Sequence, residues 1–513
     1  MGINNVSVSR ISNSKKNIVY GVTKQLIGIG LTFCVRTLLI YRLGVQYQGL
    51  NSLFSSILQI LNLTDLGFSA AVTYILYKPI ADDDTETICC IVAFLKKVYR
   101  IVGTVLLVIG AVVSLFIPYL ISGDYPNDIN IYLLFYIFLI NSSISYFLFA
   151  YKSTLLTALQ RDDLVSKAHL ISSITMRIIQ IGVLFLFKNF YFFALVMVLG
   201  SIINNLLAQF FSRKFFPQFI PKGRMDSELK KDLKKQVSAV FVNRLSDVAR
   251  NGFDDVIIST LLGLTLVAVY DNYYYILTAI VGFMSIVIHG VRASVGNSIV
   301  TESIEKNYND LRRFSFLFMW LSGWCSVCLL CLYQPFMRIW MSNNNEVVFP
   351  DHIMFLFCLY FYTLCVTHTK NIYSEARGLF WECRFLYIIE AVANLVLNIV
   401  LGYFFGIIGI IVATIITIVL INFFCGARIL FKHYFTFGYY RFLIDHLKYG
   451  IITTIVGGGC YCICRYFIPD GVIGFLIRIV VCIFVPNILF LSVYCKTKLF
   501  KDCLRIVKRT LKN

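Results

Sequence analysis

Residues 236–262 (QVSAVFVNRLSDVARNGFDDVIISTLL) form an apolar stretch long enough to cross a bilayer, yet they carry side chains that bind charged groups. On an α-helix, which turns about 100° per residue, the polar members fall within an arc of about 140°. A charge that faces lipid costs about 3 kcal/mol or more, so this arc must face water, a polar cavity or partner charges. Its members are Asn243, Arg244, Asp247, Arg250, Asn251, Asp254 and Asp255.

Two interpretations of this segment are open. In the structural one the charges neutralise each other along the helix, Arg244 with Asp247 and Arg250 with Asp254. In the functional one the face is the charged wall of a substrate pathway. The arginines then bind an anion, and the three aspartates, Asp255 included, are counter-ions or couple transport to an ion. We favour the functional interpretation.

Three further ionisable residues lie in the first two apolar stretches. Lys24 lies about 12 Å along the helix from Lys16, too deep for easy escape, so it is a cavity candidate. Arg36 lies nearer the other membrane face, where it either lines a cavity or extends to the interface. Asp65, in LNLTDLGF, is either a counter-ion or proton carrier, or an acid that packs between helices.

Two other apolar stretches carry polar residues at helical spacing. Glu390, Asn394 and Asn398 follow one another at intervals of four and so form one stripe, and Arg177 stands three residues before Gln180. These groups either join helices by hydrogen bonds or line a polar cavity. Because they occur in both halves of the chain, they are compatible with a central cavity, in which Glu390 would belong with the counter-ions.

The composition indicates that most of this chain lies in a lipid bilayer. Of 513 residues 58% are apolar and 14% charged, and the mean hydropathy is +0.77. In lipid the backbone must satisfy its own hydrogen bonds, so we expect an all-α integral membrane protein. Tight hairpins are expected at Gly263 and Phe404. The spans, about fourteen in number, are predicted at 18–40, 50–77, 101–121, 129–151, 166–187, 189–211, 236–262, 264–290, 314–336, 352–373, 385–403, 405–427, 449–468 and 472–495.

The distribution of the 46 Lys and Arg residues predicts the topology. Most lie in alternate connections, as cytoplasmic loops do. This bias predicts that both termini are cytoplasmic, and it explains the net charge of +19 by topology rather than by nucleic acid binding. The opposite side holds only Arg42, Lys188, Arg338 and Arg465.

The basic segment 213–235 follows six predicted spans and divides the chain. We therefore expect an N-terminal lobe at 1–212, a cytoplasmic linker at 213–235, a C-terminal lobe at 236–432, and two further helices with a basic tail at 433–513.

Motifs for catalysis or metal binding are missing from the sequence. It has no phosphate-binding glycine loop with Lys-Ser/Thr, no HExxH and no nucleophile elbow. Most of the sixteen cysteines lie in apolar spans without metal-ligand spacing, so we interpret them as small buried hydrophobes. We expect no enzyme, no metal and no cofactor, with H⁺ or Na⁺ as the coupling ion.

The N-terminal 120 residues resemble the polysaccharide-exporting (Wzx-type) oligosaccharide flippases. The residues that carry the resemblance are Arg36, Leu43-Gly44, Tyr47, Gly49 to Phe54, Asp65-Leu66-Gly67, Leu76 to Pro79, and KKVYR at Lys96 to Arg100. The resemblance implies a fold related to MATE exporters and lipid II flippases, with two six-helix lobes around a central cavity and two additional helices.

The resemblance also implies a function: transfer of an undecaprenyl-pyrophosphate-linked oligosaccharide from the inner to the outer leaflet of the inner membrane by alternating access. A cationic cavity would be carried by Lys24, Arg36, Arg244 and Arg250, since guanidinium groups replace the hydration of a pyrophosphate well. The implied partners are membrane lipids, the lipid-linked substrate, and the glycan polymerase and glycosyltransferases of the same pathway. The aspartates of 236–262 depart from a purely cationic cavity.

Two alternatives stay open. One is a MATE-like small-molecule exporter or a flippase for the peptidoglycan precursor, in which an acidic or aromatic cavity is expected for drugs. The other is a membrane enzyme that acts on lipid-linked sugars. The longest predicted outer connection, Met337 to Asp351, is short for the acceptor and catalytic groups of such an enzyme.

Overall fold

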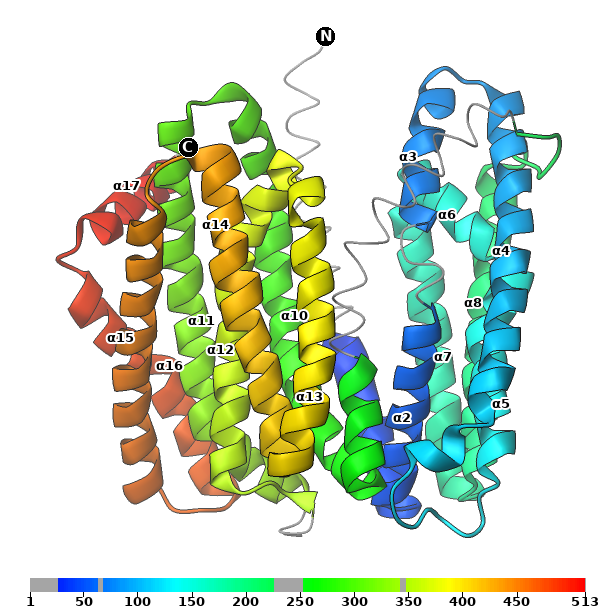
Figure 1. The fold of residues 1–513 in the computed structure, drawn as a ribbon, viewed down its shortest axis with the longest axis horizontal. Coiled ribbons are helices and arrows are strands. Elements are labelled where there is room, and N and C mark those ends of the chain that lie inside the picture. The colour runs from blue at the N-terminus through cyan, green and yellow to red at the C-terminus, as the bar shows by residue number, and fades with distance from the viewer. Residues whose placement is uncertain (1–25, 63–67, 226–251, 342–346, 513) are drawn as a thin grey trace. The chain divides into compact units, whose positions relative to one another are not determined.

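The computed structural model describes residues 26–62, 68–225, 252–341 and 347–512, and within these ranges the chain is helical with no strand (Figure 1). Nine of the described helices are long and apolar enough to cross a membrane, or ten if the bent pair α5–α6 is one span. The predicted all-α membrane fold is therefore confirmed. The number of fourteen spans stays a prediction.

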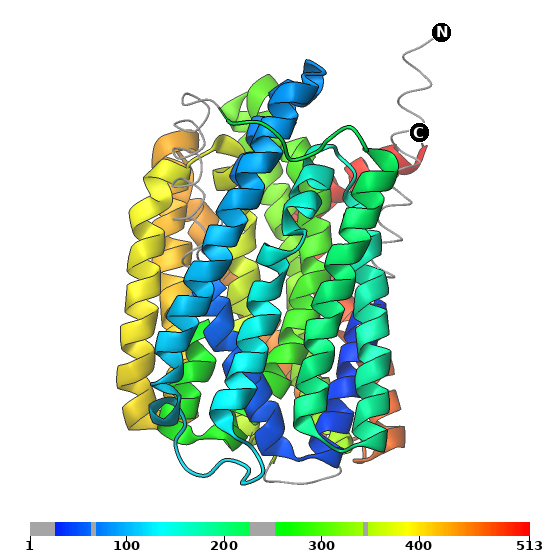
Figure 2. The same ribbon diagram turned by 90° about the vertical axis from the view of Figure 1, so that its right-hand side faces the viewer.

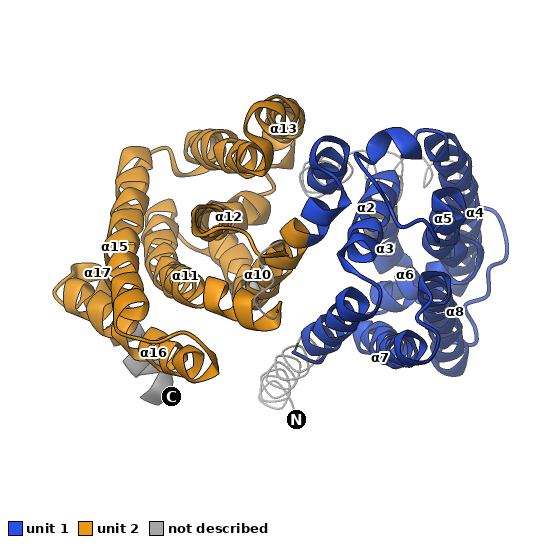
Figure 3. Cartoon of the chain, turned by 90° about the horizontal axis from the view of Figure 1, so that it is seen from below, with its two compact units in different colours: residues 1–268 blue, residues 269–513 orange. Residues whose placement is uncertain are grey.

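The chain divides into two compact units, residues 1–268 and residues 269–513 (Figure 3). The first contains helical segments at residues 26–42 and 252–262 and the elements α2 (Val45–Leu61), α3 (Phe68–Ala81), α4 (Thr85–Ser114), the 3₁₀ helix η2 (Ile117–Leu120), α5 (Ile131–Phe147), α6 (Ala150–Ala158), α7 (Asp162–Leu186) and α8 (Phe190–Phe215). The predicted lobe boundaries at 212 and 235 stay predictions.

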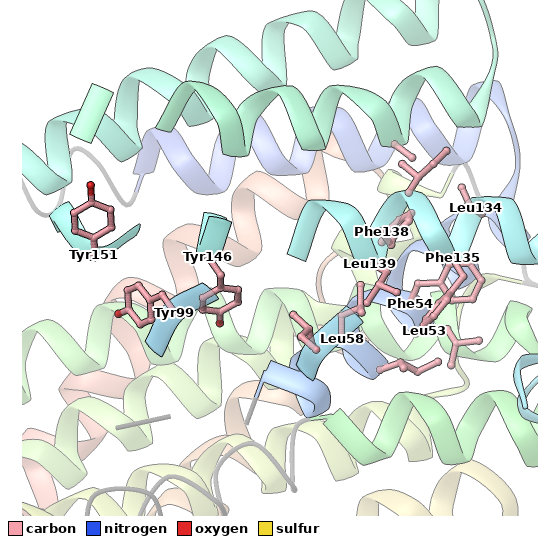
Figure 4. Packing of buried hydrophobic residues seen from close by; sticks show 14 of the residues in the cluster. Leu53, Phe54, Leu58, Tyr99, Leu134, Phe135, Phe138, Leu139, Tyr146 and Tyr151 are labelled. Atoms are coloured by element: carbon pink, nitrogen blue, oxygen red, sulfur yellow. The ribbon is translucent and has the colours of Figure 1, made fainter. Parts of the chain in front are cut away.

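Within the first unit α4, α5, α7 and α8 run side by side (Figures 1 and 2). Asparagines begin two of these helices, because the side chain of Asn130 accepts hydrogen bonds from the first amides of α5 and that of Asn189 does the same for α8. The core is aromatic: the ring of Phe54 in α2 meets Phe135 and Phe138 of α5 edge-on, at 5.4 and 5.6 Å between centroids (Figure 4).

The helix α4 begins at Thr85, well before the start of the predicted span, 101–121. The Asp84 carboxylate accepts a 3.0 Å hydrogen bond from the amide of Thr87 and so caps the helix. Hydrogen bonds from the hydroxyl and amide of Thr87 hold the pKa of Asp84 below its usual value. The helix is therefore longer than the predicted span at its N-terminal end, because charged residues that lower the hydropathy continue it beyond the apolar region.

The second unit is built on α11, which packs against α12, α15, α16 and α17. Its elements are α10 (Leu264–Thr301), near whose start the division between units falls, α11 (Ile304–Trp340), α12 (Asp351–Arg377), α13 (Phe380–Ile416), the π-helix η4 (Thr417–Cys425), α14 (Gly426–Leu430), the π-helix η5 (Phe431–Phe435), α15 (Tyr439–Tyr466), α16 (Val472–Tyr494) and α17 (Lys498–Lys512).

Both predicted tight hairpins are confirmed. The chain reverses at Gly263, which has φ 91° and ends the segment 252–262, and again inside α13 at Gly406, with φ 58° and ψ −137°. Only glycine adopts such dihedrals at low cost. The second reversal leaves three consecutive aromatic side chains exposed at its tip: Tyr403, Phe404 and Phe405.

Candidate functional site

The structure describes about half of the predicted site residues and brings some of them together. Asp254 and Asp255 lie together in the first unit, and Glu390, Asn394 and Asn398 lie together in the second. The other predicted residues that it describes are Arg36 and Arg177. Those that lie outside the described residues are Lys24, Asp65, Arg244, Asp247, Arg250 and Asn251.

The two acids of the charged segment are buried within the first unit. Asp254 is 3% exposed and Asp255 is 8% exposed. The hydroxyl of Ser56 in α2 donates a 2.7 Å hydrogen bond to Oδ2 of Asp255. A buried carboxylate in a membrane helix needs such donors. At its described end, therefore, the charged face of this helix turns toward protein rather than lipid.

Two glycines allow α2 to approach this segment and the start of α10 closely. A Cβ atom on Gly49 would lie 2.2 Å from the carbonyl oxygen of Leu264, and one on Gly252 would lie 2.6 Å from Cγ1 of Ile60. Small residues at such crossings are characteristic of membrane helix pairs. The close crossing is what brings the short hydroxyl side chain of Ser56 within reach of Asp255.

The two predicted arginines take different positions. Arg36 is half-buried on the segment 26–42. Arg177 in α7 donates from Nη1 to Oε1 of the fully buried Gln180, at 3.2 Å. This hydrogen bond lies within α7, so the roles predicted for Arg177, inter-helix packing or cavity lining, stay predictions.

A cationic cluster in the first unit was missed by the sequence analysis. The ring of Tyr151 in α6 has the ammonium groups of Lys96 and Lys152 near its face, at 6.0 and 5.7 Å from its centroid. Arg100 and Arg213 lie within electrostatic range of the same tyrosine. Lys152 is 4% exposed and donates a 2.8 Å hydrogen bond to a backbone carbonyl. We call Lys96, Arg100, Lys152 and Arg213 the basic cluster.

The basic cluster adjoins a groove of about 490 Å³ along α4, lined by Lys96, Lys97, Arg100 and Thr104. From the sequence, these lysines and arginines were interpreted only as topology determinants and, in KKVYR, as part of the family resemblance. Their spacing in KKVYR shows that Lys96 and Arg100 share one helix face. The contribution of Lys152 and Arg213, from two other helices, requires the fold.

In the second unit the predicted stripe of α13 faces the returning chain. Asn422 of η4 donates a 2.8 Å hydrogen bond to Oε2 of Glu390. Asn394 donates to the hydroxyl of Thr414 at 3.2 Å, and Asn398 donates to Oδ1 of Asn394 at 3.3 Å. All three stripe residues are at most 2% exposed. The stripe is thus a continuous buried polar network.

Lys370 of α12 adds a cation to this network. It is 2% exposed, donates to Oδ1 of Asn371 at 2.6 Å, and Glu390 is among the charges that act on it. A Cβ atom on Gly426 would lie 2.6 Å from its ammonium nitrogen, so glycine leaves room for that group. From the sequence, Lys370 was counted only among the cytoplasmic basic residues that predict topology, although the predicted span 352–373 includes it.

The fold is that of a known class of membrane transporter. A structure of the lipid II flippase MurJ in an inward closed conformation has a TM-score of 0.63 and 16% identity, over 91% of this chain and 99% of that one. A multidrug resistance MATE family transporter of the MOP superfamily, inward-facing, has a TM-score of 0.62 and 13% identity, over 80% and 98%. A MOP superfamily transporter from Pyrococcus furiosus has a TM-score of 0.56 and 14% identity, over 81% of this chain and 96% of that one.

The family follows from the sequence itself. The profile of the family described as polysaccharide biosynthesis protein matches residues 14–292, more than half of the chain. The chain is a multi-pass membrane protein that belongs to this family, and the resemblance of its N-terminal motifs is confirmed. No curated protein sequence matches it significantly.

Proposed function

We propose that this protein is a flippase that moves an undecaprenyl-pyrophosphate-linked oligosaccharide from the inner to the outer leaflet of the plasma membrane by alternating access. The observation that carries the proposal is membership of the polysaccharide biosynthesis family in a chain with a transporter fold. A transport role, rather than catalysis, agrees with the absence of catalytic motifs from the sequence.

The substrate's head group supplies the physical reason for buried cations. A pyrophosphate that leaves water must exchange its hydration for charged donors, and arginine and lysine provide them. In this proposal Arg36, Arg244 and Arg250, with Lys24, hold the head group inside the membrane. The basic cluster lies on the cytoplasmic side, together with both termini, and attracts the anionic head group before it enters.

Coupling to an ion gradient completes the proposal. Glu390 is a buried carboxylate that accepts a hydrogen bond from Asn422, and its charge acts on the buried Lys370. Such an acid inside a membrane protein changes its interactions when it gains or loses a proton or a sodium ion. The alternative acids are Asp65, Asp247, Asp254 and Asp255. We expect H⁺ or Na⁺ to drive the cycle.

The decisive experiment is leaflet-resolved transport in vesicles that contain the purified protein. A labelled lipid-linked oligosaccharide is placed in one leaflet, and its arrival in the other is measured with a membrane-impermeant reagent. We expect translocation by the native chain and a large loss in Arg244→Ala and Arg250→Ala variants that still insert. Native rates in both variants would reject the assignment of these arginines.

Three parallel measurements separate the alternatives. Lipid II replaces the oligosaccharide lipid in one, and efflux of a fluorescent organic cation is followed in another. Transport of either one without transport of the oligosaccharide lipid would contradict the proposal. A covalent change in the lipid-linked sugar, detected by mass spectrometry, would indicate an enzyme instead.

A further inference from the structure

Three cysteines that are far apart in the sequence meet inside the second unit. They are Cys331 of α11, Cys464 of α15 and Cys482 of α16, and their sulfur atoms all lie within 4.8 Å of one another. Each is at most 3% exposed. Among the described residues this is the group of His, Cys, Asp or Glu side chains that could together hold a metal ion. We call it the thiol cluster.

Two of the three cysteines stand four residues before a proline, in CLYQP (331–335) and CIFVP (482–486). Proline has no backbone N–H, so it cannot supply the usual helical hydrogen bond to the carbonyl four residues earlier. At Cys482 the indole of Trp324 in α11 supplies a donor instead, at 2.8 Å. This cross-helix bond fixes Cys482 against α11, the helix that carries Cys331.

A cation lies next to the thiol cluster. Arg478 is 3% exposed, precedes Cys482 by one helical turn, and donates from Nε to the carbonyl of Cys464 at 3.3 Å. Its Nη2 also donates to Asp470 at 2.9 Å. Its positive charge is close enough to act on the Cys464 thiol. Thiolates in this position would therefore have a buried positive charge beside them.

A small cavity adjoins two of the three cysteines. A cavity of about 20 Å³ is bordered by Cys331, Cys464 and Arg478. Its wall continues to Arg338 and Arg465, near the ends of α11 and α15, and to Asp470 in the connection between α15 and α16. This volume is about that of one water molecule by the same measure. It admits a single ion and leaves no room for a bulky ligand.

We propose that the thiol cluster is a binding site for one thiophilic metal ion, Cu(I), held by the sulfurs of Cys331, Cys464 and Cys482. With metal–sulfur bonds of about 2.3 Å, a trigonal ion holds its three sulfurs about 4 Å apart. The sulfurs here reach that spacing by small side-chain adjustments. Soft sulfur ligands select Cu(I) and zinc. A structural zinc site takes four protein ligands, and the described residues offer three.

The consequence of occupancy is a cross-link between three helices. The ion would tie α15 and α16 to α11, so that the last two membrane helices of the second unit are fixed to its central helix. Binding releases the thiol protons to solvent. Three thiolates and Cu(I) together carry two negative charges, and Arg478, which also pairs with Asp470, places one positive charge beside them. No change in the oxidation state of sulfur or metal is involved.

The test uses the full-length protein in detergent, reduced and handled without oxygen. Cu(I) is added as a complex with a coloured chelator, and the metal that stays with the protein after gel filtration is measured. We expect about one copper per chain in the native protein, with three sulfur neighbours by X-ray absorption. Cys331→Ser, Cys464→Ser and Cys482→Ser should each retain almost none.

Cys365→Ser is the matched control, because Cys365 is as deeply buried on α12 but is outside the thiol cluster. It should bind copper like the native protein. If a cluster variant fails to accumulate, thermal unfolding of the native protein with and without Cu(I) decides: the proposal requires a higher unfolding temperature with Cu(I).

Three outcomes would overturn the proposal. The first is copper retained by all three serine variants, or lost from the Cys365 control. The second is retention of added Zn(II), but not Cu(I), by the native protein, which would make this a zinc site. The third is a disulfide between two of the three cysteines in the protein as isolated, found by mass spectrometry without reduction, because it would remove two ligands.

Discussion

The hydroxyl of Ser56 donates a 2.7 Å hydrogen bond to the carboxylate of Asp255, 199 residues further along the chain. Both side chains are buried, and two glycines make the crossing of their helices close. An acid that sequence alone marks as expensive in a membrane is therefore anchored by a specific donor within the first compact unit. The hydrogen bond links the first predicted lobe to the charged helix.

Removal of this donor should weaken the first unit. Ser56→Ala leaves Asp255 with one donor fewer, and a buried group that loses a hydrogen bond costs about 1–3 kcal/mol. We expect a lower unfolding temperature in detergent. Ser55→Ala is the control, because Ser55 is exposed and donates to the carbonyl of Asn51 in its own helix. Equal unfolding temperatures for the two variants would show that the bond contributes nothing.

The bend between α5 and α6 should depend on Asn205. The two helices meet at 51°, and the side chain of Asn205 in α8 accepts the amide of Phe149 at 3.2 Å and donates to Ser145 at 2.8 Å. Asn205→Leu exposes a backbone amide to an apolar interior, at a cost of about 1–3 kcal/mol. Thermal unfolding measures the effect. The less buried Asn204→Leu should be closer to the native protein, and the reverse order would refute this role.

The basic cluster should control capture of the anionic head group. Lys96→Gln and Arg100→Gln remove partly or fully exposed charges, so folding should be unaffected while transport falls about tenfold each, the equivalent of one charged hydrogen bond. The loss should shrink at high salt, which screens exposed charges. Lys214→Gln, on the exposed end of α8, is the control. A loss of transport that is the same at all salt concentrations would argue against electrostatic capture.

Glu390 and Lys370 should be energetically coupled. Glu390→Gln keeps an acceptor for Asn422 but removes the negative charge that acts on the buried Lys370, so we expect a loss of about 1–3 kcal/mol. Lys370→Met in the same chain removes the uncompensated cation and should restore part of the lost free energy of unfolding. A double-mutant cycle on thermal unfolding measures the coupling. Additive effects would show that the two charges do not interact.

Ion coupling through Glu390 has its own test. In vesicles with an imposed H⁺ or Na⁺ gradient, the native chain should transport faster than without one, and Glu390→Gln should lose that difference while it still inserts. Asn398→Ala is the control, because it alters the same polar network without a change in charge. A variant that still responds to both gradients would assign coupling to another acid.

Hydropathy and charge predicted the membrane fold because the length of an apolar stretch and the position of Lys and Arg can be read along the chain, without knowledge of contacts between helices. The hairpins at Gly263 and Phe404 were predictable because no polar connection separates the apolar stretches there. The start of α4 was not predictable from hydropathy. The helix begins after its cap, Asp84, and runs through the charged residues Lys96 and Arg100, which lower the hydropathy below that of a membrane span.

Less of the candidate site than of the fold could be predicted from the sequence. Periodicity found the stripe of Glu390 and Asn398 because all its members lie on one helix. Lys370 was missed because the charge of Glu390 acts on it from another helix, and the basic cluster was missed because it combines three helices. Contacts between helices depend on packing, and spacing along one chain does not record them.

We expect the reversal at Gly406 to influence how deeply the second unit lies in the bilayer. Its tip presents Tyr403, Phe404 and Phe405, which are 74%, 70% and 64% exposed. Among them Tyr403 has the amphipathic ring that favours the head-group layer, and the two phenylalanines add apolar surface that favours burial in lipid. A turn held at the membrane surface would oppose movement along the membrane normal, so we expect the second unit to tilt about this turn, rather than shift as a whole across the bilayer, during transport.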